Sequence, residues 1–451
     1  MRSSRFPVPS SQYWQLATGN WSLPPATPPS PQLETVIFQL PRPPFPPMRC
    51  ILSPLLSLLL VAGSTYALAD AKLPPNFTRE VLAGPEIPEP MDLAFAPDGA
   101  ARITARAGEV WRLDTTSRQK HKVGTLESDV AGDRGLHGIA FHPDFPSTPH
   151  LFLFHHAKDH PKGEYLSRVV RLNVTGTGAS SSLDLASAKV LLEWTGDEGA
   201  QHVGGGLLAH PTERALYISS GDNNKIWELK QYYNDPNNRA QSTGDLRGKV
   251  LRIGFDGSIP PGNPFVGQPG ARPEVYTRGH RQAWAFSFDP VTGWVLLSEN
   301  GGDEKDDHEK VLRLKPGANN GWPRIFADGM DTLTRTNHVE GFETPWFSYV
   351  RGQGGSCTGG LIYRAPKSGA AFPTNFHGGL FYSDYNRKSV RFAPIDPATQ
   401  RPAASQSFAQ NLPGGPVTLR LGPDGALYLI EYGGWFQATT NDAVTRITFK
   451  P

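Results

Sequence analysis

From about residue 77 to the C-terminus, apolar and polar residues alternate in short runs that end in turns rich in glycine, proline and aspartate. A repeat of two residues is typical of a strand with one buried face. The pattern predicts strands over residues 102–106 and 109–113, which follow an A-P-D-G turn at 96–99 and are joined by a tight turn at 107–108. Helical patterns of about 10–15 residues are missing between the strands, so an α/β fold is not expected.

Turns of the same kind recur along the chain and give it a repeat. Besides the turn at 96–99 they lie at residues 142–144, 210–212, 289–290 and 422–425, and a sixth, less regular one is expected between 363 and 373. Six units of short strands predict an all-β fold, a six-bladed β-propeller of four-stranded antiparallel blades. A sandwich with a second domain is the structural alternative, but no linker after residue 75 divides the chain.

The composition agrees with a turn-rich fold. The 451 residues include 47 glycines and 43 prolines, which helices disfavour and turns require. The net charge is only +2, without a basic stripe, so a nucleic-acid partner is not expected. The two cysteines, Cys50 and Cys357, are too far apart in sequence to form a metal-binding pair by spacing.

The first 69 residues read differently from the rest. Residues 1–47 hold 12 of the 43 prolines and no sustained periodicity, which predicts a disordered extension or an over-extended reading frame with Met48 as the true start. Residues 48–69 combine a basic start, a short apolar run and an A-L-A end, the pattern of a secretory signal peptide. Cleavage after Ala69 would leave residues 70–451 as a secreted or periplasmic propeller domain without a membrane span.

One stretch, residues 201–224, combines features that suit chemistry. His202 precedes three glycines, and a predicted strand over 215–219 then leads into a G-D-N-N turn. An imidazole can move a proton near neutral pH, and glycines leave room for a flat ligand. A β-hairpin with a surface histidine is the alternative that these residues alone leave open.

Other blocks extend the pattern in a fixed order. They lie at residues 133–145, 240–253, 276–290, 298–304 with 319–323, 359–364, 379–385 and 422–428. Together with residues 201–224 they resemble, over about residues 77–448, the pyrroloquinoline quinone (PQQ)-dependent soluble sugar dehydrogenases, the glucose/sorbosone dehydrogenase family. The resemblance implies a six-bladed propeller that oxidises aldose sugars or related polyols, with PQQ and Ca²⁺ as cofactors and an external electron acceptor as partner.

The resemblance also implies roles for single residues. His202 matches the family's general base, and Arg281 matches the arginine beside the quinone. Further contacts to the cofactor or the sugar would come from the polar residues Asp133, Asn223, Gln282 and Arg420.

A calcium site would lie in the next block. Gly301 and Gly302 match the backbone carbonyls that hold the family's calcium ion. Since calcium prefers hard oxygen ligands, Asp303, Asp307 and Glu309 are the expected companions.

Several departures place the chain in a divergent branch of the family. The asparagine that usually follows the arginine is Gln282, and the tyrosine of the N-Y-G-W-P block is Asn320. Two cofactor-binding arginines expected before the last G-P-D-G turn are replaced by Gly415 and Val417, with Arg420 nearby. Two alternatives therefore stay open. One is a carbohydrate- or protein-binding propeller that has lost the cofactor, and the other is a calcium-dependent lactone hydrolase.

Overall fold

The short alternating segments of the sequence form strands, and the strands pair in chain order into antiparallel sheets. The computed structural model describes residues 71–199, 201–223, 238–303, 306–324, 341–353, 355–366, 371–434 and 438–451. The predicted extension (1–47) and signal peptide (48–69) lie outside these residues. In the part of the chain described here, no helix is long and apolar enough to cross a membrane.

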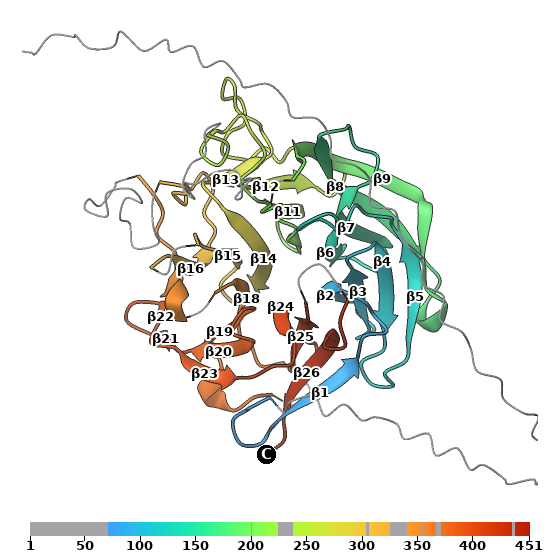
Figure 1. Ribbon diagram of the computed structural model, residues 1–451, viewed down its shortest axis with the longest axis vertical. Helices are drawn as coiled ribbons and strands as arrows, with labels where there is room; N and C mark the ends of the chain where they lie inside the picture. The colour runs from blue at the N-terminus through green and yellow to red at the C-terminus, as the bar shows by residue number, and fades with distance from the viewer. Residues whose placement is uncertain are drawn as a thin grey trace, which may run out of the picture. The chain divides into compact units, whose positions relative to one another are not determined.

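Six four-stranded sheets form a ring, so the predicted six-bladed β-propeller is confirmed (Figure 1). The first blade comprises β2 (Pro90–Phe95), β3 (Ala101–Ala105), β4 (Glu109–Leu113) and β5 (Lys120–Thr125). The second comprises β6 (Leu136–Phe141), β7 (His150–Ala157), β8 (Glu164–Thr175) and β9 (Ser182–Asp197). The third comprises β10 (Leu207–His210), β11 (Ala215–Ser220), β12 (Lys249–Gly254) and β13 (Val275–Arg278).

The remaining blades follow the same order. The fourth comprises β14 (Gln282–Asp289), β15 (Trp294–Asn300), β16 (His308–Arg313) and β17 (Phe347–Val350). The fifth comprises β18 (Cys357–Ile362), β19 (Leu380–Asp384), β20 (Ser389–Ala393) and β23 (Gln406–Ala409), with a small hairpin of β21 (Ile395–Asp396) and β22 (Arg401–Pro402) inserted. The sixth comprises β24 (Gly415–Leu421), β25 (Leu427–Tyr432), β26 (Ala443–Phe449) and β1 (Phe77–Ala83). Three short 3₁₀ turns complete the elements: η1 (Gly178–Ser180), η2 (Arg351–Gln353) and η3 (Thr374–Phe376).

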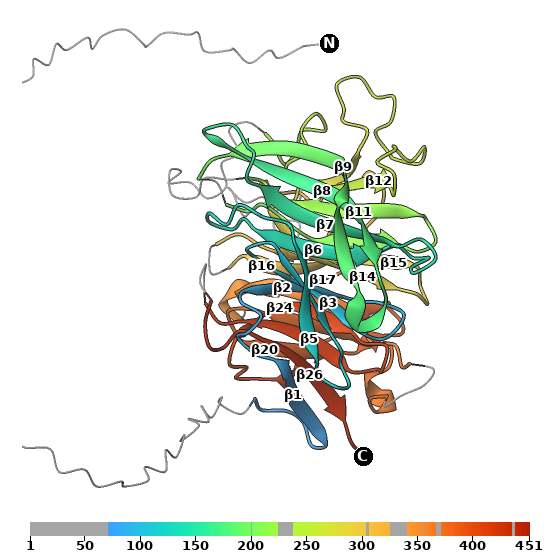
Figure 2. The same cartoon turned by 90° about the vertical axis from the view of Figure 1, so that its right-hand side faces the viewer.

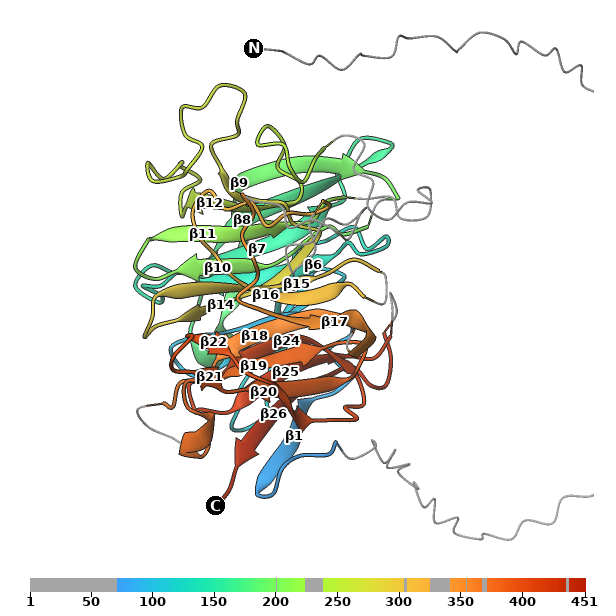
Figure 3. The same ribbon diagram turned by 90° about the vertical axis from the view of Figure 1, so that its left-hand side faces the viewer.

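The ring is closed by strands from the two ends of the described chain. β1 pairs antiparallel with β26, from Phe77 opposite Phe449 to Ala83 opposite Val444, and the two side views show them lying together (Figures 2 and 3). The first strands of successive blades, β2, β6, β10, β14, β18 and β24, also contact one another around the axis. Because the N-terminal strand completes the last blade in this way, β1 holds the propeller shut.

The repeated turns of the sequence all join the first strand of a blade to the second. The A-P-D-G turn connects β2 to β3, where Gly99 has a φ of 79° and its N–H donates to the Ala96 carbonyl. The turn from β24 to β25 repeats this geometry, with a φ of 83° at Gly425. Positive φ explains why glycine stands at both positions. The irregular sixth turn lies between β18 and β19 and contains η3.

Apolar side chains fill the spaces between neighbouring blades. One cluster joins blade one to blade six through fully buried residues such as Ile103 and Val444. Another joins blade five to blade six through aromatic rings, among them Phe77, Phe372 and Phe408, whose centroids lie 4.8–5.8 Å apart. The two strands that close the ring are therefore anchored by packing as well as by hydrogen bonds.

The blade topology sets where loops meet. In an antiparallel blade the start of the first strand and the end of the second lie at the same end of the sheet. The starts of β2, β6, β10, β14, β18 and β24 therefore share one end of the ring with the ends of β3, β7, β11, β15, β19 and β25. The repeated turns gather at the opposite end.

A buried ion pair at the ring closure leads to a stability prediction. Arg79 on β1 donates two hydrogen bonds, of 2.8 and 2.9 Å, to the Glu431 carboxylate on β25, which is fully buried. Arg79→Ala leaves this carboxylate without its counter-charge, so we expect the free energy of unfolding to fall by about 3–5 kcal/mol. Urea denaturation measures the loss. The matched control is Lys122→Ala, which breaks the exposed pair with Glu109 and should cost no more than about 1 kcal/mol; equal losses in both variants would contradict the prediction.

Candidate active site

A cavity of about 240 Å³ opens at the end of the ring where first strands begin and second strands end. Blades one, four, five and six contribute to it, together with the connections that lead into blades two and three. Its lining residues are Met91, Arg106, Asp133, Gln201, His202, Arg281, Gln282, Trp284, Asn300, Asp303, Arg351, Ser356, Thr358, Tyr385, Asn386, Val417 and Tyr432. Five residues predicted from the sequence are among them, namely Asp133, His202, Arg281, Gln282 and Asp303.

His202 is held rigidly at the entrance to β10. It is 6% exposed and has a φ of 58°, an uncommon backbone conformation for a residue with a side chain. Its N–H donates to the Asp133 carboxylate at 2.9 Å. Its carbonyl oxygen lies so close to Gly221 that a Cβ there would approach to 1.8 Å. Asp133 and Gly221 thus fix the backbone that presents the imidazole.

Asp222 orients the ring of His202. Its Oδ1 lies 2.8 Å from Nδ1 of His202, and its Oδ2 accepts a hydrogen bond of 2.7 Å from the indole of Trp322. With Nδ1 engaged, Nε2 is the ring nitrogen that remains to exchange a proton with a ligand. The sequence placed Asp222 in a G-D turn but gave it no role. Only the fold brings this turn beneath the histidine.

The glycines after His202 allow protein atoms, rather than a ligand, to approach the backbone closely. A Cβ at Gly205, where φ is 128°, would lie 2.3 Å from Nδ1 of His137. A Cβ at Gly206 would lie 2.3 Å from the carbonyl oxygen of Trp284. We predicted from the sequence that these residues leave room for a flat ligand. In the structure, protein atoms of the neighbouring blades fill that room.

Arg281 lies beside the cavity at the start of β14 and is 5% exposed. Its guanidinium donates to Oδ2 of Asp303 and lies over the ring of Trp322, 5.6 Å from the centroid. Asp303 also pairs with Arg351, at 3.3 Å. One carboxylate therefore holds two guanidinium groups at the cavity wall.

A buried network lies behind Arg281. The Glu299 carboxylate accepts hydrogen bonds from the Arg281 N–H (2.9 Å) and the Lys310 ammonium (3.2 Å), and lies 2.7 Å from Nδ1 of His280. Burial alone would raise the pKa of Glu299, but the Lys310 and His280 charges and these hydrogen bonds lower it to about 2. Glu299 therefore stays ionised and anchors the backbone that carries Arg281.

The carboxylates expected around calcium are already paired with protein groups where the structure describes them. Among the described residues, no group of three or more histidine, cysteine, aspartate or glutamate side chains converges as a metal site would require. Asp303 is engaged by Arg281 and Arg351, and Glu309, which is fully buried, accepts from Arg351 and from the Cys357 and Gly301 N–H groups. Burial raises the pKa of Glu309, although the Cys357 amide and Arg351 oppose the shift. Of the other ligands expected for calcium, Asp307 is buried and has a partner of its own, and the Gly301 and Gly302 carbonyls remain as candidates.

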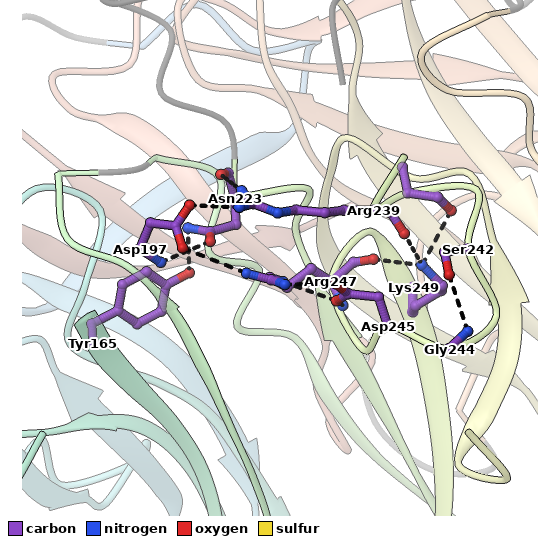
Figure 4. Close-up of polar contacts among 10 residues, drawn as sticks. Tyr165, Asp197, Asn223, Arg239, Ser242, Gly244, Asp245, Arg247 and Lys249 are labelled. Atoms are coloured by element: carbon purple, nitrogen blue, oxygen red, sulfur yellow. Dashed lines mark hydrogen bonds and ion pairs between the residues drawn. The ribbon is translucent and has the colours of Figure 1, made fainter. Parts of the chain in front are cut away.

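Asn223 is not brought to the cavity. Its amide oxygen accepts from the Asp197 N–H at 2.9 Å, and its amide nitrogen donates to the Tyr165 hydroxyl at 3.1 Å (Figure 4). Arg239 binds both its carbonyl and the Asp197 carboxylate. The side chain of Asn223 thus ties blade two to blade three, and we assign it a structural role.

The same close-up shows Lys249, whose side chain is fully buried. The ammonium of Lys249 donates to the carbonyl oxygens of Arg239, Ala240 and Arg247 at 2.6, 3.2 and 2.6 Å (Figure 4). It fastens the loop before β12 to its blade. The ammonium group of Lys249 is therefore used in these hydrogen bonds, and Lys249 does not line the cavity.

Arg420 also lies apart from the predicted site residues. Its guanidinium pairs with Asp92 at 2.6 Å and reaches the Phe286 carbonyl at 3.2 Å. It lines two other cavities along the axis, the larger of which is bordered by the repeated turns at the opposite end of the ring. Arg420 was predicted near the cofactor because it is close in sequence to Gly415 and Val417. Strand β24 runs along the channel, however, so Arg420 lies further from the cavity than Val417 does.

Several residues of the cavity were not predicted. Arg106 and Arg351 add two guanidiniums, and Trp284, Tyr385 and Tyr432 add aromatic rings. Asn300 contributes an amide oxygen that is buried and has no hydrogen-bond partner within the described residues. All of them lie at, just after or near a strand end that faces the cavity, Trp284 being the third residue of β14. This position is visible in the sequence only once the strand order is known. At the two positions where arginines were expected, Val417 lines the cavity and Gly415 packs against the Tyr385 ring.

Comparisons with known proteins agree with this geometry. A family model described as Glucose / Sorbosone dehydrogenase matches residues 87–434. Quinoprotein glucose dehydrogenase B of Acinetobacter calcoaceticus is 28% identical over 280 residues, which make up 57% of this chain and 57% of that protein. The chain thus matches little more than half the length of this relative.

Two further matches cover more of the fold. Aldose sugar dehydrogenase YliI of Escherichia coli is 27% identical over 358 residues, 76% of this chain and 87% of that protein. The crystal structure of an oxidoreductase described as a glucose dehydrogenase from Thermus thermophilus superposes with a TM-score of 0.66 at 26% identity, covering 82% of this chain and 99% of that one. The resemblance predicted from the ordered sequence blocks is confirmed.

The depressed pKa of Glu299 predicts an acid-sensitive fold. In the folded protein this pKa lies near 2, below the ordinary value of 4.5, so the folded state binds the proton less readily than the unfolded chain. The stabilisation is complete above about pH 4.5 and is lost as the pH falls towards 2, a difference of about 3 kcal/mol. We expect Glu299→Gln to weaken the fall of the unfolding free energy with pH, measured by chemical denaturation at pH 2–5. Glu127→Gln, at an exposed position, should leave this pH dependence unchanged. An unchanged pH dependence in Glu299→Gln would contradict the low pKa of Glu299.

Proposed function

Because the chain belongs to the glucose/sorbosone dehydrogenase family, we propose that it oxidises aldose sugars or related polyols with PQQ as the bound cofactor. Membership in the family supports a sugar dehydrogenase-like oxidoreductase. The observation that carries the proposal is the His202–Asp222 pair, placed at a cavity that also holds Arg281. In this arrangement a proton acceptor and a fixed positive charge face the same space.

The residues of the cavity suit a flat, anionic quinone. Arg281 and Arg351 would bind its negatively charged groups, since a planar guanidinium both pairs with carboxylates and stacks on rings. The guanidinium of Arg106, at the same cavity, is already held by Glu89 and by the carbonyls of Val130, Gly132 and Arg134. Trp284 and Tyr385 offer aromatic faces. The unpartnered amide oxygen of Asn300 offers a hydrogen-bond acceptor. When bound, PQQ supplies the two-electron acceptor for the hydride of the sugar.

His202 would take the proton that must leave with the hydride. Oxidation of an aldose at its anomeric carbon removes one hydride from carbon and one proton from the hydroxyl group. Nε2 of His202 accepts that proton, while Asp222 holds the Nδ1 proton and stabilises the positive charge that forms on the ring. Arg281, which lines the cavity, would stabilise negative charge on the electron acceptor.

The alternatives rest on weaker ground. A binding propeller without cofactor would need no oriented histidine, whereas His202 is fixed by Asp133, Asp222 and Gly221. A calcium-dependent lactone hydrolase would require carboxylates converging on a metal, and no such group is found among the described residues. The export of the mature chain remains part of the proposal. N-terminal sequencing of the secreted protein checks it, with residue 70 as the expected first residue.

The proposal is tested by reconstitution. The full chain is incubated with PQQ and assayed with aldoses and a dye as external acceptor. We expect aldose-dependent dye reduction and a quinone absorbance that stays with the protein after gel filtration. If calorimetry detects sugar binding without PQQ while no quinone is retained and no dye is reduced, the protein is a binding module and the proposal falls.

His202 should affect catalysis far more than quinone binding. We expect His202→Ala to lower kcat by about 10²–10⁴-fold because the proton acceptor is lost. Bound PQQ, measured by absorbance, should remain. His377→Ala is the control, since His377 lies in the connection from β18 to β19, at the opposite end of the ring, where its Nε2 donates to the Phe372 carbonyl at 2.8 Å. Equal activity in both variants would remove His202 from the reaction.

Asp222 should act through His202. We expect Asp222→Asn to lower kcat by roughly 10²-fold while KM for the sugar changes little, because the amide no longer holds the reactive tautomer. In the His202→Ala background the same substitution should add almost nothing, since its target is already gone. Steady-state kinetics of the two single variants and the double variant measure this coupling. Multiplicative losses in the double variant would show that Asp222 acts independently.

A further inference from the structure

The arginine at the start of η2 joins two of the three carboxylates that the sequence predicted as calcium ligands. Arg351 pairs with Asp303 at 3.3 Å through one terminal nitrogen and with Glu309 at 3.0 Å through the other. The second nitrogen also donates to the Gly355 carbonyl at 2.9 Å, and the Arg351 N–H donates to the Asp307 carbonyl at 2.6 Å. Backbone and side chain of Arg351 thus both bind the loop that follows β15.

All four oxygens of these two carboxylates have partners. In Asp303, Oδ1 faces Arg351 and Oδ2 accepts from Arg281. In Glu309, Oε1 accepts from Arg351, and Oε2 accepts from the Cys357 and Gly301 N–H groups at 2.9 and 3.3 Å. Asp307, buried beside them, also has a partner of its own.

The charges of the four paired side chains cancel. The guanidiniums of Arg281 and Arg351 supply two positive charges, and the carboxylates of Asp303 and Glu309 supply two negative charges. A divalent cation bound between these two carboxylates would add positive charge to a balanced set of four side chains in which Arg281 and Glu309 are buried. It would also need about six to eight oxygen ligands. Asp303 and Glu309 could contribute theirs only by giving up their arginines.

We propose that the guanidinium of Arg351 takes the place of a divalent cation at this site, so that the cavity binds its anionic cofactor without calcium. The inference rests on the proposed function for the identity of that cofactor. A guanidinium keeps its charge at any pH of interest and cannot be removed by a chelator. Together with Arg281, it presents fixed donors at the wall of the cavity.

The first test uses the unmodified full chain. Its melting temperature is measured in EDTA and in CaCl₂, and the Kd of PQQ is measured by protein fluorescence under the same two conditions. We expect the same melting temperature in both and a ratio of Kd values near one. A calcium-dependent rise in melting temperature, or quinone binding strengthened tenfold or more by calcium, would overturn the inference. If PQQ fails to bind under either condition, the proposed function falls, and the melting temperatures alone decide the cation question.

The second test removes the guanidinium. Arg351→Ala leaves Asp303 and Glu309 without their shared partner, so we expect the melting temperature in EDTA to fall by roughly 5 °C and CaCl₂ to restore part of it. The matched control is Arg364→Ala, which removes a similarly half-buried arginine from the buried carboxylate of Asp289. Because Arg364 pairs with one carboxylate rather than joining two, calcium should not restore that loss. The inference is contradicted if calcium fails to raise the melting temperature of Arg351→Ala, or if it raises the melting temperatures of both variants equally.

Discussion

The pairing of antiparallel strands within each blade is the constraint on which the site depends. It places the start of every first strand and the end of every second strand at one end of the ring. His202 precedes β10, Arg281 precedes β14, and Arg106 follows β3. These residues are far apart in sequence, and none contacts the others through local structure. They share a cavity because closure of β1 onto β26 brings all six blades around one axis.

Around the cavity, charges are organised in layers. Residues at the surface of the cavity, such as His202 and Arg281, are each held by a buried carboxylate, Asp222 for the imidazole and Glu299 for the arginine backbone. A buried carboxylate is stable only where hydrogen bonds and opposite charges compensate its desolvation. The second layer therefore rigidifies the first. This arrangement suits a site in which a proton acceptor and a positive charge must keep fixed positions relative to a ligand.

The structure shows which residues stand at the cavity in place of the two arginines expected on β24. The positions expected to carry two arginines on β24 hold Gly415, which packs against Tyr385, and Val417. The guanidiniums that line the cavity come instead from Arg106 in blade one, which is paired with Glu89, and from Arg351 between blades four and five, which is paired with Asp303 and Glu309. A guanidinium can reach a central cavity from any blade, because every blade sends two strand ends to it. Charge can therefore move between blades while the ring stays the same.

The sequence by itself determined the fold class, the six repeats and the family. Alternation with a period of two and turns that require glycine are local properties, so they can be read along the chain. It also identified His202 and Arg281, because their neighbours form distinctive blocks. It could not reveal Asp222, Arg106 or Arg351, nor separate Asn223 and Arg420 from the cavity. Which side chains meet at the axis, and which are already paired elsewhere, depends on contacts between blades, and only the closed ring decided those.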